Sequence, residues 1–299
     1  MTEPATMPSH GAPRVGAVFR PQLPPERLRD YVTAAETAGL DDVWLWEDCF
    51  LEGGLTTASA ALAWTSSIRI GLGLMPVPFR NPALASMEIS TLARLFPGRF
   101  APTAGHGVLS WMDQVGAGVA SPMTLLREWV TAARALLHGE TVTVSGQYIR
   151  LAGVTLDWPP SVIPPLLVGA RGPKTLALGG ELADGLVLDA GISPAGVRRA
   201  VETAAAARPH DVVAFVLCGT GPGSEDRVQA ELSATLAGRG GEPSAELMAL
   251  GSAADVAATI RAYADAGATS VILQPTGDDP DPAAVIELAA GARAVLAGG

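Results

Sequence analysis

The chain has 299 residues, of which 48% are hydrophobic and 17% are charged, and its formal net charge is −10. This apolar content is enough for a large core and excludes an intrinsically disordered chain. A pI of about 4.9 argues against a nucleic-acid partner, because binding a phosphate backbone requires clustered Lys and Arg side chains.

The N-terminus and the most apolar stretch of the sequence indicate where in the cell the protein is located. The first residues, MTEPATMPSHGA, lack the basic and apolar regions of a signal peptide, so we expect residues 1–13 to form a disordered tail. Residues 58–79 are interrupted by Arg69 and two prolines, which leaves no run of about 18 apolar residues to span a membrane. We interpret Cys49 and Cys218 as free thiols. These features predict a cytoplasmic protein without a membrane partner.

From Val15 onward, short apolar runs alternate with longer helical patterns, which is typical of βα units and a parallel sheet. We predict strands at Val15–Phe19, Val43–Trp46, Ile68–Leu74, Phe100–Ala104, Leu166–Gly169, Leu186–Asp189, Val212–Cys218 and Ser270–Leu273. Eight strands, each followed by a helix, predict an α/β fold closed into a (β/α)8 TIM barrel, which commonly uses about 250 residues as one domain. We therefore expect a single barrel domain over residues 14–299.

Helix boundaries in the sequence support this assignment. Gly39 has the position of a C-cap glycine after AAETAG, and Gly267 ends a later helix in the same way. Asn81 followed by proline marks the start of another helix, and Ser252 is a suitable N-cap for ADVAATIRAYADAG.

Two stretches exceed a minimal barrel. After a helix over Thr124–Leu137, residues 138–165 alternate like a hairpin around Ser145-Gly146 and then become proline-rich. Residues 219–251 contain a Gly/Pro turn, a helix and a second turn, GRGGEPS. We expect both stretches to be insertions at the rim of the barrel.

In barrels of this kind the loops after the strands build the active site. The second strand runs into WLWEDCF, which places Glu47, Asp48 and Cys49 at the rim. One interpretation is a polar cluster beside a ligand ring, with one member able to transfer a proton. The alternative is a solvated acidic turn with a half-buried cysteine.

The third strand contains Gly71 and Gly73 among large apolar residues. Glycine weakens a strand, so these positions indicate a bulge or the close approach of something flat to the backbone. A barrel corner that needs small residues is the alternative interpretation.

The fourth strand ends in APTAGHGVLS, where Gly105 and Gly107 flank His106. Glycines let backbone N–H groups approach an anion, and a histidine adds a donor that titrates near neutral pH.

The fifth strand ends in LLVGARGPKT, where Pro173 suits the first position of a helix. Arg171 and Lys174 at a helix N-terminus oppose the helix dipole, which is easier to understand if an anion lies between them. We therefore predict a phosphate site at this helix start.

Four stretches carry a resemblance to a known family. They are AAETAGLDDVWLWED, TSSIRIGLGLMPVPFRNPALASMEISTLARLFPGRF, VGARGPKTLALGGELADG and AYADAGATSVILQP. With them, nearly the whole chain after Arg14 resembles the luciferase-like monooxygenase superfamily, and more narrowly its members that use the deazaflavin coenzyme F420. The resemblance implies a cofactor ring at the strand C-termini and a phosphate held by the loops after strands four and five. It also implies a cis peptide at Gly73-Leu74 behind the ring.

The chain departs from this family at positions that bear on catalysis. Sugar-phosphate dehydrogenases of the family carry His where this chain has Cys49, and Glu where it has Val108. The resemblance to methylene-tetrahydromethanopterin reductases implies an acid on strand one, at the position of Val18 in this chain. The acid/base pair of the sugar-phosphate dehydrogenases is therefore missing from this chain.

The resemblance implies an oxidoreductase that transfers a hydride between F420 and a small organic substrate, acting as a reductase. The alternatives are an FMN-dependent luciferase-like monooxygenase and a non-catalytic barrel that binds a cofactor or metabolite. The candidates for proton transfer are His106 and Glu47, and no metal ligands are assigned. The cofactor-binding candidates are Asp48, Cys49, Gly73, Leu74, Gly105, His106, Gly107, Gly169, Ala170, Arg171, Gly172 and Lys174. Family members are often dimers, and the apolar helix Ala83–Leu95 could face a partner subunit, so we expect a homodimer.

Overall fold

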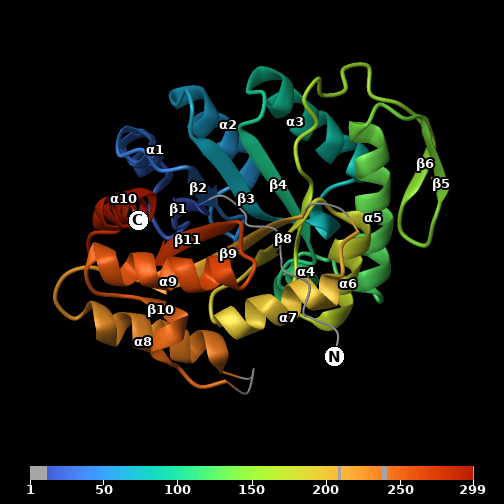
Figure 1. Cartoon of the computed structure of the whole chain (residues 1–299). Helices are drawn as coiled ribbons and strands as arrows, with labels where there is room; N and C mark the ends of the chain where they lie inside the picture. Colours follow the sequence, from blue (N-terminus) through green and yellow to red (C-terminus); the bar gives the residue numbers. More distant parts are fainter. Residues whose placement is uncertain (1–11, 208–209, 238–240, 299) are drawn as a thin grey trace, which may run out of the picture.

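The strands of this chain form a closed parallel barrel surrounded by helices (Figure 1). The computed structural model describes residues 12–207, 210–237 and 241–298. The barrel strands are β1 (Arg14–Val18), β2 (Asp42–Leu45), β3 (Arg69–Pro76), β4 (Phe100–Gly105), β7 (Leu167–Gly169), β8 (Gly185–Leu188), β9 (Asp211–Cys218) and β11 (Ser270–Pro275). They neighbour one another in that order, and β11 pairs with β1 to close the barrel.

The predicted fold is confirmed, since each of the eight predicted strands lies within two residues of an observed one. The predicted N-terminal tail, residues 1–13, falls almost entirely outside the described residues. Both cysteines are free, as predicted.

The outer helices begin and end at the residues that their capping chemistry indicates. The helices are α1 (Leu28–Thr37), α2 (Gly54–Trp64), α3 (Pro82–Leu95), α5 (Pro122–Leu137), α6 (Pro173–Leu182), α7 (Pro194–Ala204), α9 (Ala253–Asp265) and α10 (Ala284–Gly298). The Asn81 side chain accepts a hydrogen bond at the start of α3, and Ser252 forms a capping box with Asp255 at the start of α9. Gly39 and Gly267 have φ values of 78° and 110°, the left-handed region that glycine tolerates after a helix.

Both rim insertions are present. In the first, β5 (Val142–Ser145) pairs with β6 (Arg150–Val154) as the predicted hairpin. The Glu128 carboxylate on α5 accepts hydrogen bonds from the backbone N–H groups of residues 147–149, which ties the hairpin to the barrel.

The second insertion contains the predicted helix, α8 (Ser224–Leu236), and a short strand, β10 (Met248–Ala249), that pairs in parallel with the end of β9. Part of its predicted turn GRGGEPS, residues 238–240, lies outside the described residues. The remaining elements are the helix α4 (Leu109–Gln114) and three 3-10 turns, η1 (Pro25–Arg27), η2 (Val77–Phe79) and η3 (Ala245–Leu247). The sequence did not predict α4, because six residues are too few for a helical period to emerge.

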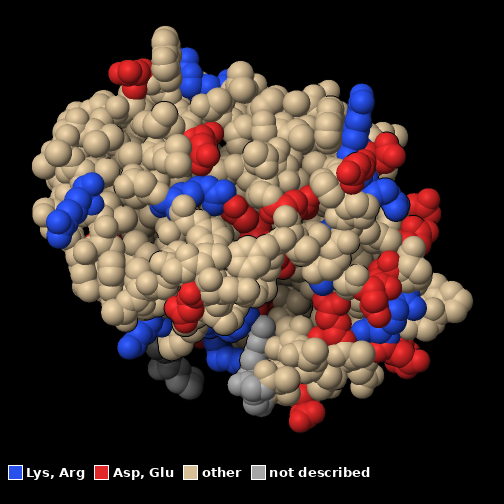
Figure 2. All heavy atoms as spheres, turned by 180° about the vertical axis from the view of Figure 1, so that it is seen from behind, with Lys and Arg blue, Asp and Glu red and all other residues tan. Residues whose placement is uncertain are grey.

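Charged side chains are unevenly distributed over the surface. On the face drawn in Figure 2, Asp and Glu side chains are most numerous on one side, where Lys and Arg side chains lie among them, and charged side chains of both signs are more scattered on the other side.

The barrel interior is filled by side chains from the strands, and Trp44 is the largest of them. A Cβ atom at Gly71 would lie 2.3 Å from two carbons of the Trp44 indole. The flat group that approaches the backbone at Gly71 is therefore the protein's own Trp44, which packs against it from inside the core. Gly73 contacts the same ring at a greater distance, with a would-be Cβ 3.1 Å away.

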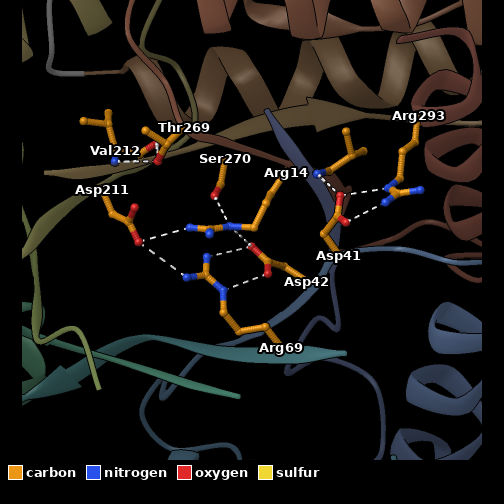
Figure 3. Close-up of polar contacts among 10 residues, drawn as sticks. Arg14, Asp41, Asp42, Arg69, Asp211, Val212, Thr269, Ser270 and Arg293 are labelled. Atoms are coloured by element: carbon orange, nitrogen blue, oxygen red, sulfur yellow. Dashed lines mark hydrogen bonds and ion pairs between the residues drawn. The ribbon is translucent and has the colours of Figure 1, made fainter. Parts of the chain in front are cut away.

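A network of ion pairs closes the N-terminal end of the barrel (Figure 3). Arg69 donates two hydrogen bonds of 2.8 Å to the fully buried carboxylate of Asp42. Asp211 lies 3.0 Å from Arg14 and 3.5 Å from Arg69, and Arg14 also donates to the Ser270 hydroxyl. Since these residues begin β1, β2, β3, β9 and β11, the network joins five strands at one end and leaves the other end for a ligand.

Glu36 on α1 joins that helix to the loop before β3. Its carboxylate accepts hydrogen bonds from the N–H groups of Ser66, Ser67 and Ile68 and from the Ser67 hydroxyl, at 2.6–3.1 Å. Partial burial would raise its pKa, but these donors, with Ser67 and Ile68 contributing most, lower it to about 2.

We expect this carboxylate to make stability depend on pH. Because its pKa is lower in the folded state, its contribution is present above the unfolded pKa and is lost as pH falls from about 4.5 towards 2. Denaturant unfolding at several pH values should show Glu36→Gln to be less stable than the native protein at pH 7, with the difference shrinking below about pH 4.5. A difference that stays constant down to pH 3 would contradict this assignment.

Candidate cofactor site

A cavity of about 670 Å³ opens at the C-terminal ends of the strands, opposite the ion-pair network. Its size is within the usual range for small-molecule and cofactor sites. The predicted site residues that line it are Glu47, Asp48, Gly73, Leu74, His106, Gly107, Gly169, Ala170, Arg171 and Gly172. Cys49, Gly105 and Lys174 are not part of the lining.

The peptide bond between Gly73 and Leu74 is cis, as the family resemblance implied. The β3–β4 register shifts between Leu72 and Met75, which is the irregularity that glycine in this strand indicated. A second cis peptide, Cys49-Phe50, follows β2 and was not predicted.

Leu74 lies on a floor made by two glycines of neighbouring strands. A Cβ atom at Gly105 or at Gly169 would lie 2.4 Å from a methyl carbon of Leu74. Gly105 thus serves the site indirectly, because it leaves room for the leucine that lines the pocket.

The loops after β4 and β7 meet on one side of the pocket. His106 Nε2 lies 3.2 Å from the hydroxyl of Thr175 in the first turn of α6. Burial lowers the pKa of His106, which favours a neutral imidazole, although the backbone of Pro122 opposes this effect.

The N-cap of α6 is Gly172, so no side chain satisfies the first N–H groups of this helix. A Cβ atom at Gly172 would meet nothing within 4 Å. An open N-terminus that faces a cavity is suited to an anion such as a phosphate.

The two basic residues predicted for this site have different surroundings. Arg171 lines the pocket, but its side chain is exposed and forms an ion pair with Asp189. Lys174 is exposed and lies outside the lining. An anion is therefore not needed to account for the charge of Arg171, because Asp189 already pairs with it, and its role at a phosphate stays a prediction.

Glu47 lines the pocket, but its carboxylate forms an ion pair with Arg80. Arg80 donates hydrogen bonds of 2.6 and 2.8 Å to its two carboxylate oxygens, and Glu88 lies 3.6 Å from the same guanidinium. Both oxygens of the Glu47 carboxylate are therefore occupied as acceptors of the Arg80 guanidinium. This geometry argues against the prediction that Glu47 transfers a proton.

Asp48 and Cys49 follow Glu47 in the chain. Asp48 lines the cavity, whereas Cys49 does not. Burial raises the pKa of Asp48, although the nearby charge of Arg20 lowers it in part. Burial and the charges of Glu47 and Asp48 raise the pKa of Cys49, so its thiol is not activated as a nucleophile.

The other half of the pocket was missed from the sequence. It is formed by Arg20, Trp46, Phe215, Glu231 and Gln274, which come from β1, β2, β9, α8 and β11 and their ends. These residues are far apart in the chain and form no motif. The only sequence signal was their position after a predicted strand or in an insertion at the rim.

The described residues also bear on metal ions and membranes. Over residues 12–207, 210–237 and 241–298, no group of three or more His, Cys, Asp or Glu side chains is arranged to hold a metal ion. Within the same ranges, every helix is too short or too polar to cross a membrane.

Comparisons with known proteins agree with this architecture. A family model described as luciferase-like monooxygenase matches residues 5–239. The 5,10-methylenetetrahydromethanopterin reductase of Methanolobus tindarius is 31% identical over 175 residues, which are 58% of this chain and 53% of that protein. The F420-dependent glucose-6-phosphate dehydrogenase of Nakamurella multipartita is 31% identical over 192 residues, which are 58% of this chain and 55% of that protein.

Among solved structures, the coenzyme F420-dependent tetrahydromethanopterin reductase of Methanopyrus kandleri has the same fold. It superimposes with a TM-score of 0.77 and 20% identity, and the match covers 94% of this chain and 98% of that one. The two sequence matches above span about half the length of each curated relative.

Proposed function

The chain belongs to the luciferase-like monooxygenase family, and from that premise we propose that it is an oxidoreductase that uses coenzyme F420. It would transfer a hydride between the deazaflavin and a small organic substrate, in the direction of a reductase. One observation carries the proposal. The glycine-containing loops after β4 and β7 meet at the uncapped N-terminus of α6, and this N-terminus opens into a cavity large enough for a cofactor. Relatives named as F420-dependent enzymes support it.

The residues present fit such a cofactor. The uncapped start of α6 at Gly172 and the His106–Thr175 pair offer donors to a phosphate. Gly73 and Leu74 offer an apolar surface to one face of a flat ring. We assign these residues to cofactor binding, with Gly107, Gly169 and Ala170 giving the backbone room to approach.

When bound, F420 would supply hydride transfer, the movement of two electrons and one proton together. A carbonyl substrate that accepts a hydride at carbon also needs a proton at oxygen. Asp48 lines the cavity and its raised pKa extends the range in which it holds a proton, so we propose it as donor in place of Glu47. His106 remains the second candidate, although its contact with Thr175 favours a role in holding the phosphate loop.

Equilibrium binding of F420 and of FMN to the purified protein tests the proposal. We expect F420 to bind at least tenfold more tightly, and reduced F420 to be oxidised in the presence of a carbonyl substrate. Preferential binding of FMN with consumption of oxygen would instead indicate an FMN-dependent monooxygenase. Tight F420 binding without turnover of any substrate would indicate a non-catalytic binding barrel.

We also propose that the protein works in the cytoplasm as a homodimer. Helix α3 exposes Leu84, Met87 and Leu95. The guanidinium carbon of Arg94, on the same helix, lies 5.1 Å from the ring centre of the exposed Trp158. Such a cluster of large apolar side chains is typical of a surface that is covered by a partner. Sedimentation of the purified protein measures this assembly directly.

A further inference from the structure

Arg20, at the end of β1, is held rigidly in the pocket wall. Its side chain is only 9% exposed, and its Nη1 donates a 2.8 Å hydrogen bond to Glu231 on α8. Its guanidinium carbon lies 4.8 Å from the centre of the Trp46 ring, and its Nε donates to Gln22. Glu231 is itself fixed, because it also accepts a hydrogen bond from the N–H of Gly277.

This wall lies across the barrel from the cofactor loops. In the ring of strands, three strands separate β1 from β7 in either direction, so Arg20 and the β7 loop are diametrically opposed. If the cofactor phosphate occupies the start of α6, the substrate has to occupy the space bounded by Arg20, Trp46 and Phe215. The inference therefore rests on the proposed function for its geometry.

The charges of the lining do not suit a negatively charged substrate. Four carboxylates and two arginines line the cavity, one of the carboxylates, Glu47, is already paired with Arg80, and among the described residues no lysine lines the cavity. Arg20 is paired with Glu231, and Arg171 with Asp189. On the Arg20 side of the cavity, away from the start of α6 that we assign to the cofactor phosphate, an anionic substrate would therefore meet no unpaired cation among the described lining residues.

Arg20 nevertheless keeps a donor that it does not use. Within the described part of the chain, its Nη2 donates no hydrogen bond, whereas Nη1 and Nε both do. A neutral oxygen of a ligand could accept from this group without displacing Glu231.

We propose that Arg20, fixed and neutralised by Glu231, determines substrate specificity by selecting uncharged compounds with a carbonyl or hydroxyl oxygen and rejecting carboxylated or phosphorylated ones. Helix α8, which belongs to the second rim insertion, is thereby the element that sets the charge of the substrate. Glu231 acts through Arg20 and is a positioning residue.

The experiment compares two ketones that differ by one charge. Cyclohexanone and 4-oxocyclohexanecarboxylate are titrated calorimetrically into the F420-loaded protein and into three variants. Glu231→Gln leaves Arg20 without its counterion, and Thr235→Lys adds a cation to the pocket face of α8 without breaking the pair. Glu181→Gln is the matched control, because it makes the same chemical change in the Arg127–Glu181 pair outside the pocket.

We expect the native protein to bind cyclohexanone at least tenfold more tightly than the keto acid. Glu231→Gln and Thr235→Lys should each shift this ratio at least tenfold towards the keto acid, and Glu181→Gln should leave it unchanged. Equal or tighter binding of the keto acid by the native protein, or an unchanged ratio in both pocket variants, would overturn the proposal.

A separate titration with F420 tests the proposed function by itself. If F420 does not bind, the proposed function fails, and the same two ketones titrated into the protein without cofactor still measure the charge preference of the Arg20 wall. Melting temperatures of the variants identify any change that results from misfolding.

Discussion

Replacing Asp42 with alanine should lower the free energy of unfolding by about 3–5 kcal/mol, the usual cost of removing one partner from a buried ion pair. Asp42 is fully buried and receives two 2.8 Å hydrogen bonds from Arg69, whose side chain is 12% exposed. Without this carboxylate, Asp211 at 3.5 Å is the one acidic partner left to Arg69 among the described residues, and Arg14 loses one of its neighbours. Denaturant unfolding monitored by circular dichroism measures the change.

The exposed pair Arg127–Glu181 provides the control for this prediction. Its side chains are 48% and 56% exposed, and Glu181→Ala should change stability by at most about 1 kcal/mol. The network lies at the opposite end of the barrel from the cavity, so the folded Asp42→Ala protein should bind F420 with nearly unchanged affinity. A loss of stability no larger than that of Glu181→Ala would show that the network at the base of the barrel does not stabilise it.

The second large effect is expected from Gly172→Thr at the N-cap of α6. The backbone there is extended, with φ −86° and ψ 155°, and a new Cβ atom would meet nothing within 4 Å. A threonine hydroxyl can cap the free N–H groups of the helix, which are the groups that we assign to the cofactor phosphate. Hydrogen bonds to charged groups contribute about 1.5–3 kcal/mol, so F420 affinity should fall about 10- to 100-fold.

Stability should move in the opposite direction, because the helix gains a cap while the ligand loses its donors. Gly53→Thr at the N-cap of α2 is the matched control, since that glycine is also uncapped and extended but lies outside the cavity. It should leave F420 affinity unchanged. Equal F420 affinity of Gly172→Thr and the native protein would remove the start of α6 from the cofactor site.

Local sequence patterns were sufficient to predict the barrel. Each βα unit carries its own periodicity and its own caps, such as Asn81, Ser252 and Gly267, so strands and helices could be placed without knowing their neighbours. The glycine-containing loops after β4 and β7 were likewise readable, because a site at the strand C-termini follows from the fold itself. The cis peptide at Gly73-Leu74 came from the family resemblance and from no physical feature of the local sequence.

What the tertiary structure decided is the partner of each charged side chain. Glu47 is paired with Arg80, Arg171 with Asp189, and Arg20 with Glu231, at separations of 33, 18 and 211 residues along the chain. A carboxylate beside a cavity can transfer a proton, bind a cation or fix an arginine, and which of these it does depends on what lies within about 4 Å of it. The sequence by itself determined the barrel, and it predicted the end at which we propose that a ligand binds and the loops that we assign to a phosphate. Only the closure of the barrel, which brings β1 beside β11 and α8 over the rim, determined the charge of the wall that a substrate would meet.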